Sequence, residues 1–591
     1  MRRYQSTPFG SHPRRRRLSW KVSLASVLIP LLGVVGTVGY VHFVREDRLL
    51  VTVVDAYSGR PVVGAQVRAG EVESWSDERG ETRIPVDHAS HLEVEQHDYD
   101  AVEVVLAPDQ RSVTVRLRPN VVRGTVIDRV DERPLAGVVV KAVQMGRVVT
   151  ETRTGPLGQY TLRGVPEGAT LLFEHDDYEE MEVTLEQRTE VSVTLRRDVL
   201  TGRIEDTRGM PVVGATIAIG DVRATSDADG AFRLSGVPEQ GEVVVKAPGY
   251  RAIAVQLPPS SRLNVQLEPI EVRAIYISAA VAAKPAALAE RLALVERSEL
   301  NAVVIDLKDS TGRVFYASQV PLAREIGAVY PIFDPEALVG ELHRRNIYAI
   351  ARIVVFEDPV LAEARPAWAI KDASTGGIWR TWKGIAWVNA YRSEVWDYNI
   401  ALALEAASFG FDEIQFDYVR FPSDGPLVHA EYGVEHNRTS RIAAIGEFLA
   451  RAHRALAPTR AYLAADIFGL QLWELGDSGI GQNLEVIAER VDYICPMVYP
   501  SHFYPGSMGF EIPNDHPYEV ILWSLQNGLE RIPEHARKLR PWLQDFSYGR
   551  GIEYGPNEVR AQIRAVADAG LNSWMLWNAD SVYHEEALTP S

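Results

Sequence analysis

Two hydrophobic periodicities divide the chain into an all-β part and an α/β part. Between about residues 50 and 269, apolar and polar residues alternate in short runs, such as Val113-Thr114-Val115-Arg116-Leu117, and Gly, Pro and Asp lie between the runs. Alternation with a period of two is typical of half-buried strands, and these intervening residues are typical of turns. The pattern therefore predicts small β-sandwiches in this part of the chain.

The all-β part repeats itself with a period of roughly 75 residues. Each copy contains a Pro-x-x-Gly element, at Pro61, Pro134 and Pro211. The copies resemble carboxypeptidase regulatory-like domains, the transthyretin-like sandwiches found in tandem on exported bacterial proteins. That resemblance implies a fold and says little about activity, so the repeats are interpreted as a stalk. We predict three β-sandwich repeats, at residues 50–119, 120–198 and 199–269.

After Pro269 strands alternate with amphipathic helices, which is the signature of βα units. Helices are expected at Ala286–Glu299, Ser440–Ala457, Asn483–Arg490 and Asn557–Ala569. Eight strands are expected, at Val272–Ser278, Ala302–Lys308, Ala349–Phe356, Glu413–Val419, Ala461–Phe468, Tyr493–Tyr499, Arg540–Phe546 and Ser573–Asn578. Residues 270–591 are therefore predicted to form a TIM (β/α)8 barrel. The alternative is an open doubly wound sheet, but no glycine-rich phosphate loop follows the first strand.

The segment Gly410–Pro422 contains the most informative strand. Its apolar residues alternate with Glu413, Gln415 and Asp417, and Pro422 ends the run. Helix-like segments lie on both sides, so the outer face of this strand is expected to be covered and its polar face to point into the barrel. A carboxylate in that position is costly unless it is paired or used. Asp417, near the C-terminal end of the strand, is therefore the first candidate for chemistry.

Composition limits the partners and cofactors. The net charge of −17 argues against nucleic acid as a partner. A single cysteine, Cys495, excludes an intrachain disulfide framework and a cysteine-cluster metal site. Asp227, Asp229 and Gly230 are interpreted as a β-turn, because the closing glutamate of a calcium loop is missing. We expect no metal and no redox cofactor.

The N-terminus predicts a membrane anchor. Arg14-Arg15-Arg16-Arg17 and Lys21 precede an apolar run from about Val22 to Val44, which is long enough to cross a bilayer. The alternative is a cleaved signal peptide, but no clear cleavage site follows. Residues 1–21 are predicted to form a cytoplasmic tail and residues 22–44 a single transmembrane helix in the lipid bilayer of the cell membrane. The repeats and the barrel would then be extracytoplasmic.

Polar and aromatic residues gather at the predicted C-terminal ends of the barrel strands, where TIM-barrel active sites lie. Carboxylates flanked by aromatic side chains suit the cleavage of glycosidic bonds, because one carboxyl protonates the leaving oxygen while another attacks or activates water. Aromatic rings pack against the C–H faces of sugars. In strand order the residues are Asp306, Lys308 and Asp309; Arg352 and Glu357; Asp417, Tyr418 and Arg420; Asp466; Tyr499, Ser501 and His502; Trp542, Gln544 and Asp545; and Trp577, Asn578 and Asp580.

Five motifs carry a resemblance that spans residues 272–583. They are Phe411–Pro422, Ala464–Gly469, Cys495–His502, Arg540–Gln544 and Trp574–Asn578. They resemble a bacterial family of glycoside hydrolase domains, catalogued as a domain of unknown function within the TIM-barrel glycosyl-hydrolase superfamily. The resemblance implies a TIM barrel that hydrolyses glycosidic bonds.

One departure from a related pattern guides the choice of catalytic residues. The motif around Asp417 is reminiscent of the chitinase-type Asp-x-Asp-x-Glu, but Val419 stands where that motif has its proton-donating glutamate. Substrate-assisted chemistry is therefore disfavoured. An α-amylase-like arrangement, with the nucleophile ending strand four and the acid ending strand five, implies Asp417 and Asp466 as the catalytic pair.

The sequence thus predicts a membrane-anchored glycoside hydrolase that acts on a cell-surface or extracellular polysaccharide. The rival hypothesis is a non-catalytic glycan-binding or envelope-scaffolding protein that retains the cleft without the acid. Of the remaining strand-end residues, ten are predicted to contact substrate, and they are Asp306, Lys308, Arg352, Tyr418, Arg420, Tyr499, His502, Trp542, Asp545 and Trp577.

Overall fold

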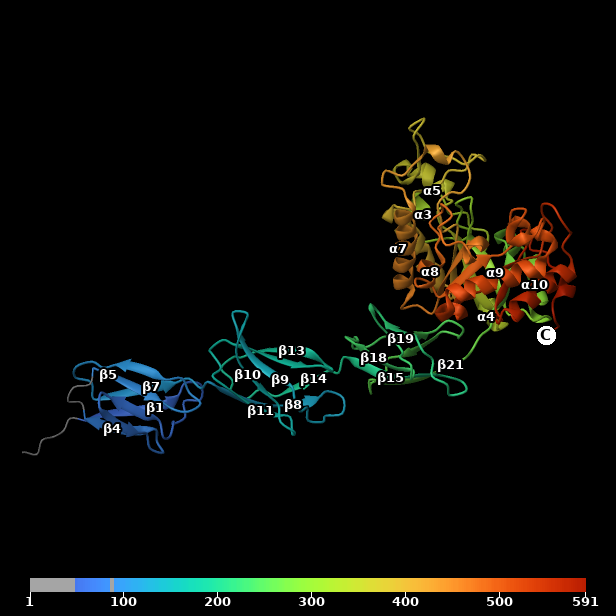
Figure 1. The fold of residues 1–591 in the computed structure, drawn as a ribbon. Coiled ribbons are helices and arrows are strands. Elements are labelled where there is room, and N and C mark those ends of the chain that lie inside the picture. The colour runs from blue at the N-terminus through green and yellow to red at the C-terminus, as the bar shows by residue number, and fades with distance from the viewer. Residues whose placement is uncertain (1–47, 86–89, 591) are drawn as a thin grey trace, which may run out of the picture. The chain divides into compact units, whose positions relative to one another are not determined.

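The computed structural model describes residues 48–85 and 90–590 of the chain (Figure 1). The first repeat forms a compact unit of its own, and the residues from Asn120 onward form a second compact unit.

Each repeat consists of a three-stranded sheet and a four-stranded sheet, with the same strand order in all three. The first has sheets β4-β1-β7 and β3-β2-β5-β6, the second β11-β8-β14 and β10-β9-β12-β13, and the third β18-β15-β21 and β17-β16-β19-β20. The strands are β1 (Arg48–Asp55), β2 (Gln66–Ala69), β3 (Val72–Trp75), β4 (Glu81–Pro85), β5 (His91–Glu95), β6 (Val102–Val105), β7 (Ser112–Leu117), β8 (Val121–Asp128), β9 (Val139–Gln144), β10 (Arg147–Arg153), β11 (Gln159–Arg163), β12 (Thr170–His175), β13 (Tyr178–Thr184), β14 (Val193–Leu195), β15 (Val199–Asp206), β16 (Thr216–Ile219), β17 (Val222–Thr225), β18 (Ala231–Ser235), β19 (Glu242–Lys246), β20 (Ile253–Gln256) and β21 (Arg262–Leu267).

Alternation of side chains gives each repeat its own apolar core, as the period of two predicts. Two strands contain a glycine because the neighbouring backbone comes very close. A Cβ on Gly124 would lie 1.7 Å from the carbonyl oxygen of Val191, and one on Gly202 would lie 1.7 Å from that of Leu263. The segment around Asp227 is a turn, in which the Asp227 side chain accepts hydrogen bonds from two backbone amides within its own loop.

The C-terminal part is a closed barrel of eight parallel strands, the TIM-barrel arrangement that the sequence predicts. Strand β22 pairs with both β23 and the last strand, β31, which closes the sheet on itself. The barrel strands are β22 (Arg273–Ile277), β23 (Ala302–Lys308), β24 (Tyr348–Val354), β26 (Glu413–Asp417), β28 (Tyr462–Phe468), β29 (Tyr493–Met497), β30 (Trp542–Gln544) and β31 (Trp574–Trp577).

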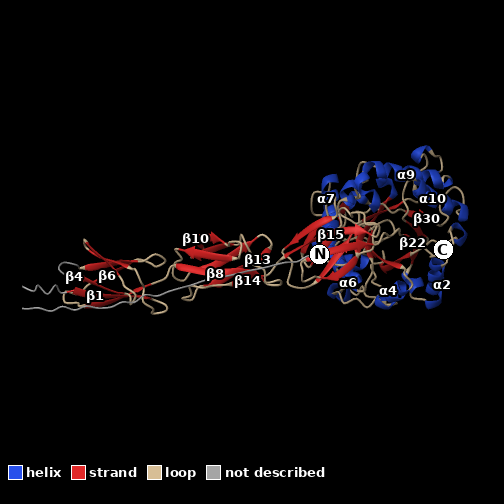
Figure 2. Cartoon of the chain, turned by 90° about the horizontal axis from the view of Figure 1, so that it is seen from below, coloured by secondary structure: helices blue, strands red, loops and turns tan. Residues whose placement is uncertain are grey.

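Helices cover the outside of the barrel (Figure 2). One apolar core lies between the strands and these helices, and a separate core of side chains fills the barrel interior. The helices are α1 (Ala279–Ala282), α2 (Pro285–Glu296), α3 (Pro321–Glu325), α4 (Pro335–Arg344), α5 (Pro359–Ala364), α6 (Ser393–Ser408), α7 (Arg438–Leu456), α8 (Leu484–Ala488), α9 (Pro517–Arg531) and α10 (Pro556–Asp568).

A long connection follows β24 and adds structure beside the barrel mouth. Within it, β25 (Lys371–Asp372) pairs with β27 (Ala430–Glu431), which lies in the connection after β26. The loops that follow two neighbouring barrel strands are thereby joined. Trp379 and Trp387 are fully buried in this insertion.

The third repeat is bonded directly to the N-terminal side of the barrel. The ammonium group of Lys246, in β19, donates hydrogen bonds to the carbonyl oxygens of Leu456, Thr459 and Ala461, at 3.0, 3.2 and 2.5 Å. The hydroxyls of Tyr462 and Tyr493, from β28 and β29, bond to backbone groups of residues 247–250. This repeat is therefore more than a spacer, in contrast to the stalk that the sequence suggests.

The expected membrane topology is corrected. Residues 1–21 and 22–44 lie outside the described residues. Within residues 48–85 and 90–590, no helix is long and apolar enough to cross a membrane. Helix α7 has 19 residues, but it carries charged side chains such as Arg441, Glu447 and Arg451. The interpretation as a single-pass membrane protein with extracytoplasmic domains and a bilayer partner has no structural support, and we do not retain it.

Candidate active site

Polar side chains from four neighbouring strands meet inside the barrel at the C-terminal ends of the strands. They are Asp306 of β23, Arg352 of β24, Asp417 of β26 and Asp466 of β28. Each has the same parity along its strand as the residues that fill the barrel interior. Each is also at least nine-tenths buried. The alternation in the sequence thus places these groups where the fold can bring them together.

Arg352 connects two of the carboxylates. One of its terminal nitrogens lies 2.6 Å from an oxygen of Asp306, while Nε and the other terminal nitrogen lie 3.1 and 2.5 Å from one oxygen of Asp417. The Tyr276 hydroxyl donates to the second oxygen of Asp306 at 2.5 Å. Burial opposes the charge on Arg352, but the two carboxylates outweigh it and hold the pKa of Arg352 well above its ordinary value.

The backbone after Asp417 adopts an uncommon conformation. Tyr418 has a φ of 51°, in the left-handed region that residues with a side chain rarely adopt. In this conformation the Tyr418 amide donates to the second oxygen of Asp417 at 2.6 Å. Both oxygens of Asp417 are therefore held, one by Arg352 and one by the backbone. Strain of this kind gathers at functional sites.

Asp466 is the immediate neighbour of Asp417 on the next strand. The register pairs Phe416 of β26 with Ala465 of β28, so the next residues of the two strands, Asp417 and Asp466, lie side by side at the same height in the sheet. One oxygen of Asp466 accepts a hydrogen bond of 2.8 Å from the indole nitrogen of Trp542. Burial, and then the negative charge of Asp417, raise the pKa of Asp466 well above its usual range. Its protonated form is therefore favoured beside the Asp417 carboxylate.

A cavity of about 370 Å³ opens above these groups. Nine of the twelve residues that the sequence selects line it, and hydrophobic side chains complete its wall, which suits a sugar better than a small ion. The nine are Arg352, Asp417, Tyr418, Arg420, Asp466, Tyr499, His502, Trp542 and Trp577, and sequence reasoning missed Phe468, Gly469, Leu470, Met497, Phe503 and Tyr504. Several of the missed residues follow β28 and β29, where only apolar character marks them.

Aromatic rings hold the cationic side chains of the cavity. The guanidinium group of Arg420 lies 4.9, 5.1 and 4.8 Å from the ring centres of Trp387, Tyr418 and Phe468. The guanidinium group of Arg352 lies 5.2 Å from the ring centre of Trp577. Cation–π contacts of this kind favour the charged arginine in a partly dry site.

His502 is fixed on the other side of the cavity. Its ring stacks on Tyr548 and contacts Tyr499, and its Nδ1 lies 3.0 Å from the Ser501 hydroxyl. Burial lowers the pKa of His502, so this imidazole is neutral at pH 7. Among the described residues no cluster of histidine, cysteine and acidic side chains could hold a metal ion.

Three predicted contact residues lie outside the cavity wall. Asp306 sits behind Arg352 and holds it. Lys308 points to the outer face of the sheet, where its ammonium group lies 2.9 Å from Asp358 and donates to the carbonyl oxygen of Val354. Asp545 is fully buried and lies 2.6 Å from Nδ1 of His584.

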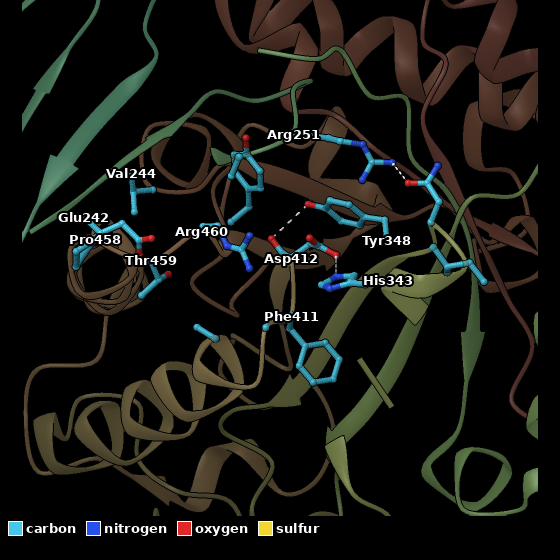
Figure 3. Close-up of a pocket in the computed structure, with 16 residues that line it drawn as sticks. Glu242, Val244, Arg251, His343, Tyr348, Phe411, Asp412, Pro458, Thr459 and Arg460 are labelled. Carbon is cyan, nitrogen blue, oxygen red and sulfur yellow. Dashed lines mark hydrogen bonds and ion pairs between the residues drawn. The ribbon is translucent and has the colours of Figure 1, made fainter. Parts of the chain in front are cut away.

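A second cavity, of about 400 Å³, lies at the N-terminal ends of the strands, between the third repeat and the barrel (Figure 3). Arg251 of the repeat donates there to Asn346, and His343 lies 2.9 Å from Asp412. Arg251, His343 and Asp412 of this cavity thus have partners within the protein. Since TIM-barrel chemistry takes place at the opposite, C-terminal face, this second cavity is interpreted as part of the structural interface.

Comparison with known families agrees with this architecture. Residues 274–583, more than half of the chain, match the family described as "Putative glycosyl hydrolase domain", and the chain belongs to that family. Residues 121–196 and 199–268 match the carboxypeptidase regulatory-like domain. Both resemblances drawn from the sequence motifs are therefore confirmed, the second of them by matches to the second and third repeats. No match was found among curated proteins.

Solved structures with similarity to the chain were also found. A hypothetical protein from Ruminiclostridium thermocellum is 35% identical over 32% of this chain and 96% of its own, with a TM-score of 0.28. The PgaB (BpsB) glycoside hydrolase domain from Bordetella bronchiseptica is 12% identical over 53% of this chain and 95% of its own, with a TM-score of 0.40. An alpha-galactosidase from Thermus thermophilus is 16% identical over 72% and 77%, with a TM-score of 0.35.

Proposed function

We propose that the barrel hydrolyses glycosidic bonds in a polysaccharide, with Asp417 and Asp466 as its paired carboxyls. The observation that carries this proposal is the meeting of the two carboxyls, one ion-paired with Arg352 and one with a raised pKa, in an aromatic-lined cavity at the C-terminal face of a TIM barrel. Membership in a family of glycosyl hydrolase domains supports the same reaction class.

Asp417 is proposed to face the anomeric carbon. Glycosidic cleavage develops positive charge on the sugar ring, and an ionised carboxylate held on both oxygens is pre-organised to stabilise it. Arg352 and the Tyr418 amide provide that hold. Because they fix the carboxylate before substrate arrives, little reorganisation is needed during the reaction.

Asp466 is proposed as the protonated partner of Asp417. Two adjacent carboxyls cannot both ionise without a large electrostatic cost, and the splitting of their proton affinities is typical of catalytic carboxyl pairs. The indole rings of Trp542 and Trp577 and the ring of Tyr499 supply the apolar wall on which sugar faces pack.

The proposal is tested by incubating the full chain with a panel of bacterial polysaccharides and measuring the reducing ends released. On a cleaved polysaccharide, Asp417→Asn should lower kcat by about 10³-fold or more, because the substitution keeps the size of the side chain and removes its charge. Binding of the polysaccharide should persist, since the aromatic wall is unchanged. Asp229→Asn, at an exposed aspartate in a turn of the third repeat, is the matched control and should have normal activity.

The outcomes separate the proposal from its rival. Binding without release of reducing ends across the panel would favour a glycan-binding protein. Normal turnover by a folded Asp417→Asn variant would refute the role given to Asp417 and leave the reaction class in place.

A further inference from the structure

Glu357 follows the C-terminal end of β24, three residues after the partner of Asp417, and is not part of the pair described so far. The pairing between the third and fourth barrel strands continues past Asp417, because the Val355 amide donates to the Asp417 carbonyl at 2.9 Å and the Phe356 amide to the Tyr418 carbonyl at 3.3 Å. Glu357 is the next residue. It therefore stands on the mouth side of Asp417, at the end of the adjacent strand.

Glu357 is mostly buried, and the part of it that reaches solvent includes its carboxyl oxygens. The residue is only 8% exposed, and within residues 48–85 and 90–590 its carboxyl has no hydrogen-bond or ion-pair partner. The charged groups that act on it are Arg420, Asp424, Asp417 and Lys383. Of these, Arg420 and Asp417 line the cavity. Carboxyls whose pKa is shifted by burial and by specific charged neighbours cluster at functional sites.

The proton affinity of Glu357 suits neutral conditions. Burial raises the pKa of Glu357 to about 7, although the positive charge of Arg420 opposes the shift. A general acid works best when its pKa lies near the working pH, because it can then both lose and regain its proton.

Asp466 differs in this respect. Its carboxyl adjoins Asp417 at the same level of the sheet, so loss of its proton would create two adjacent anions deep in the barrel. Asp466 is therefore suited to keeping its proton and donating a hydrogen bond, whereas Glu357 is suited to transferring one.

We propose that Glu357 is the general acid and base that exchanges a proton with the glycosidic oxygen, opposite Asp417. This inference rests on the proposed function. With Asp417 as the nucleophile and Glu357 as the proton donor, the reaction is of the retaining class.

The reaction then takes two balanced steps. In the first, the glycosidic C–O bond breaks, the leaving oxygen keeps the electron pair and takes the proton of Glu357, and the Asp417 carboxylate forms a bond to the anomeric carbon. In the second, water attacks that carbon, the Glu357 carboxylate takes a proton from the water, and Asp417 leaves with its electron pair.

The test compares the wild-type full chain with Glu357→Gln on a panel of 2,4-dinitrophenyl hexosides and N-acetylhexosaminides and on the cleaved polysaccharide. With polysaccharide, kcat/KM should fall by about 10²- to 10⁴-fold, the range of general acid–base catalysis. With the dinitrophenyl substrate, kcat/KM should stay within about tenfold, because this leaving group needs no proton, whereas kcat should fall as the second step slows. Azide, a nucleophile that needs no base, should restore kcat and yield the glycosyl azide.

The pH profile gives a second readout that a structural role would not produce. With polysaccharide, wild-type kcat/KM should decrease as the pH rises through about 7, because Glu357 loses the proton that it must donate. The residual kcat/KM of Glu357→Gln should not show this decrease. Glu363→Gln is the matched control, since Glu363 is largely exposed and pairs with Arg380 at 3.0 Å.

Two failures are distinguishable. If the wild-type chain hydrolyses no substrate, the proposed function falls, and the role of Glu357 falls with it. If the wild-type chain is active, two results would refute only the role of Glu357. In the first, Glu357→Gln keeps its activity on polysaccharide and the decrease of kcat/KM above about pH 7. In the second, the variant loses activity equally on polysaccharide and on the dinitrophenyl substrate, and azide does not restore it.

Discussion

At the scale of single residues, two buried arginines in the interior of the barrel form ion pairs with different tasks. The pair between Arg352 and Asp417 lies at the open end and borders the cavity. The pair between Arg540 and Glu413 lies at the closed end, where both side chains are fully buried and the Arg540 guanidinium sits 4.4 Å from the ring centre of Tyr493. Only the first pair can meet a substrate, so the second is a structural element.

Removing one partner of the structural pair should therefore destabilise the barrel without changing its chemistry. Glu413→Gln leaves the buried charge of Arg540 uncompensated, which costs about 3–5 kcal/mol. The measurement is chemical denaturation of the full chain. The double variant Glu413→Leu with Arg540→Met removes both charges, so its free energy of unfolding should decrease much less. Equal losses in the single and double variants would contradict this account.

Sequence periodicity predicted most of the candidate site, and its failures have local causes. Lys308 has the same parity as Asp306, so simple alternation places both inside the barrel. The register shifts between Asp306 and Lys308, and this bulge turns Lys308 outward to Asp358. Conversely, Tyr418 is out of phase with Asp417 but reaches the cavity, because its positive φ ends the strand. Neither a bulge nor a left-handed residue is visible in the pattern of apolar positions.

At the scale of elements, the order of strands and helices followed from the sequence, because each strand is a short apolar run and each long helix is amphipathic. The contact between β19 and the end of α7 did not. Lys246 looks in the sequence like an ordinary charged residue at the end of a strand, yet its ammonium group is buried against three carbonyl oxygens at and just after the C-terminal end of α7. Only the packing of one domain on another reveals such a partner.

This contact gives a prediction for the pair of elements. Lys246→Met keeps the apolar stem and leaves the three carbonyl oxygens without their donor, so we expect a loss of about 3 kcal/mol in the free energy of unfolding. Thermal denaturation measures it. Lys141→Met is the control, because Lys141 pairs with Glu174 in a partly exposed salt bridge of the second repeat and should cost about 0–1 kcal/mol. A loss no larger than that of the control would show that the buried contact contributes little.

At the scale of the whole molecule, the sequence predicts that a chain beginning near Pro269 folds alone, since the barrel has its own core. The bonds from Lys246, Tyr462 and Tyr493 change that expectation. Without the third repeat, Tyr462 loses the backbone partners that its buried hydroxyl needs. The apolar side chains at the N-terminal end of the barrel interior also become exposed to water. The third repeat and the barrel are therefore expected to unfold as one cooperative unit.

Truncation tests this expectation. A chain beginning at Val199 retains the third repeat and should melt at the same temperature as one beginning at Asn120, because the second repeat has a core of its own. A chain beginning at Pro269 should melt about 5 °C or more below both, since the lost interface is worth several kcal/mol in a domain of this size. Calorimetry should also show one transition, not two, for the chain beginning at Val199. A barrel fragment with an unchanged melting temperature would establish instead that the third repeat is a separate domain that merely touches the barrel.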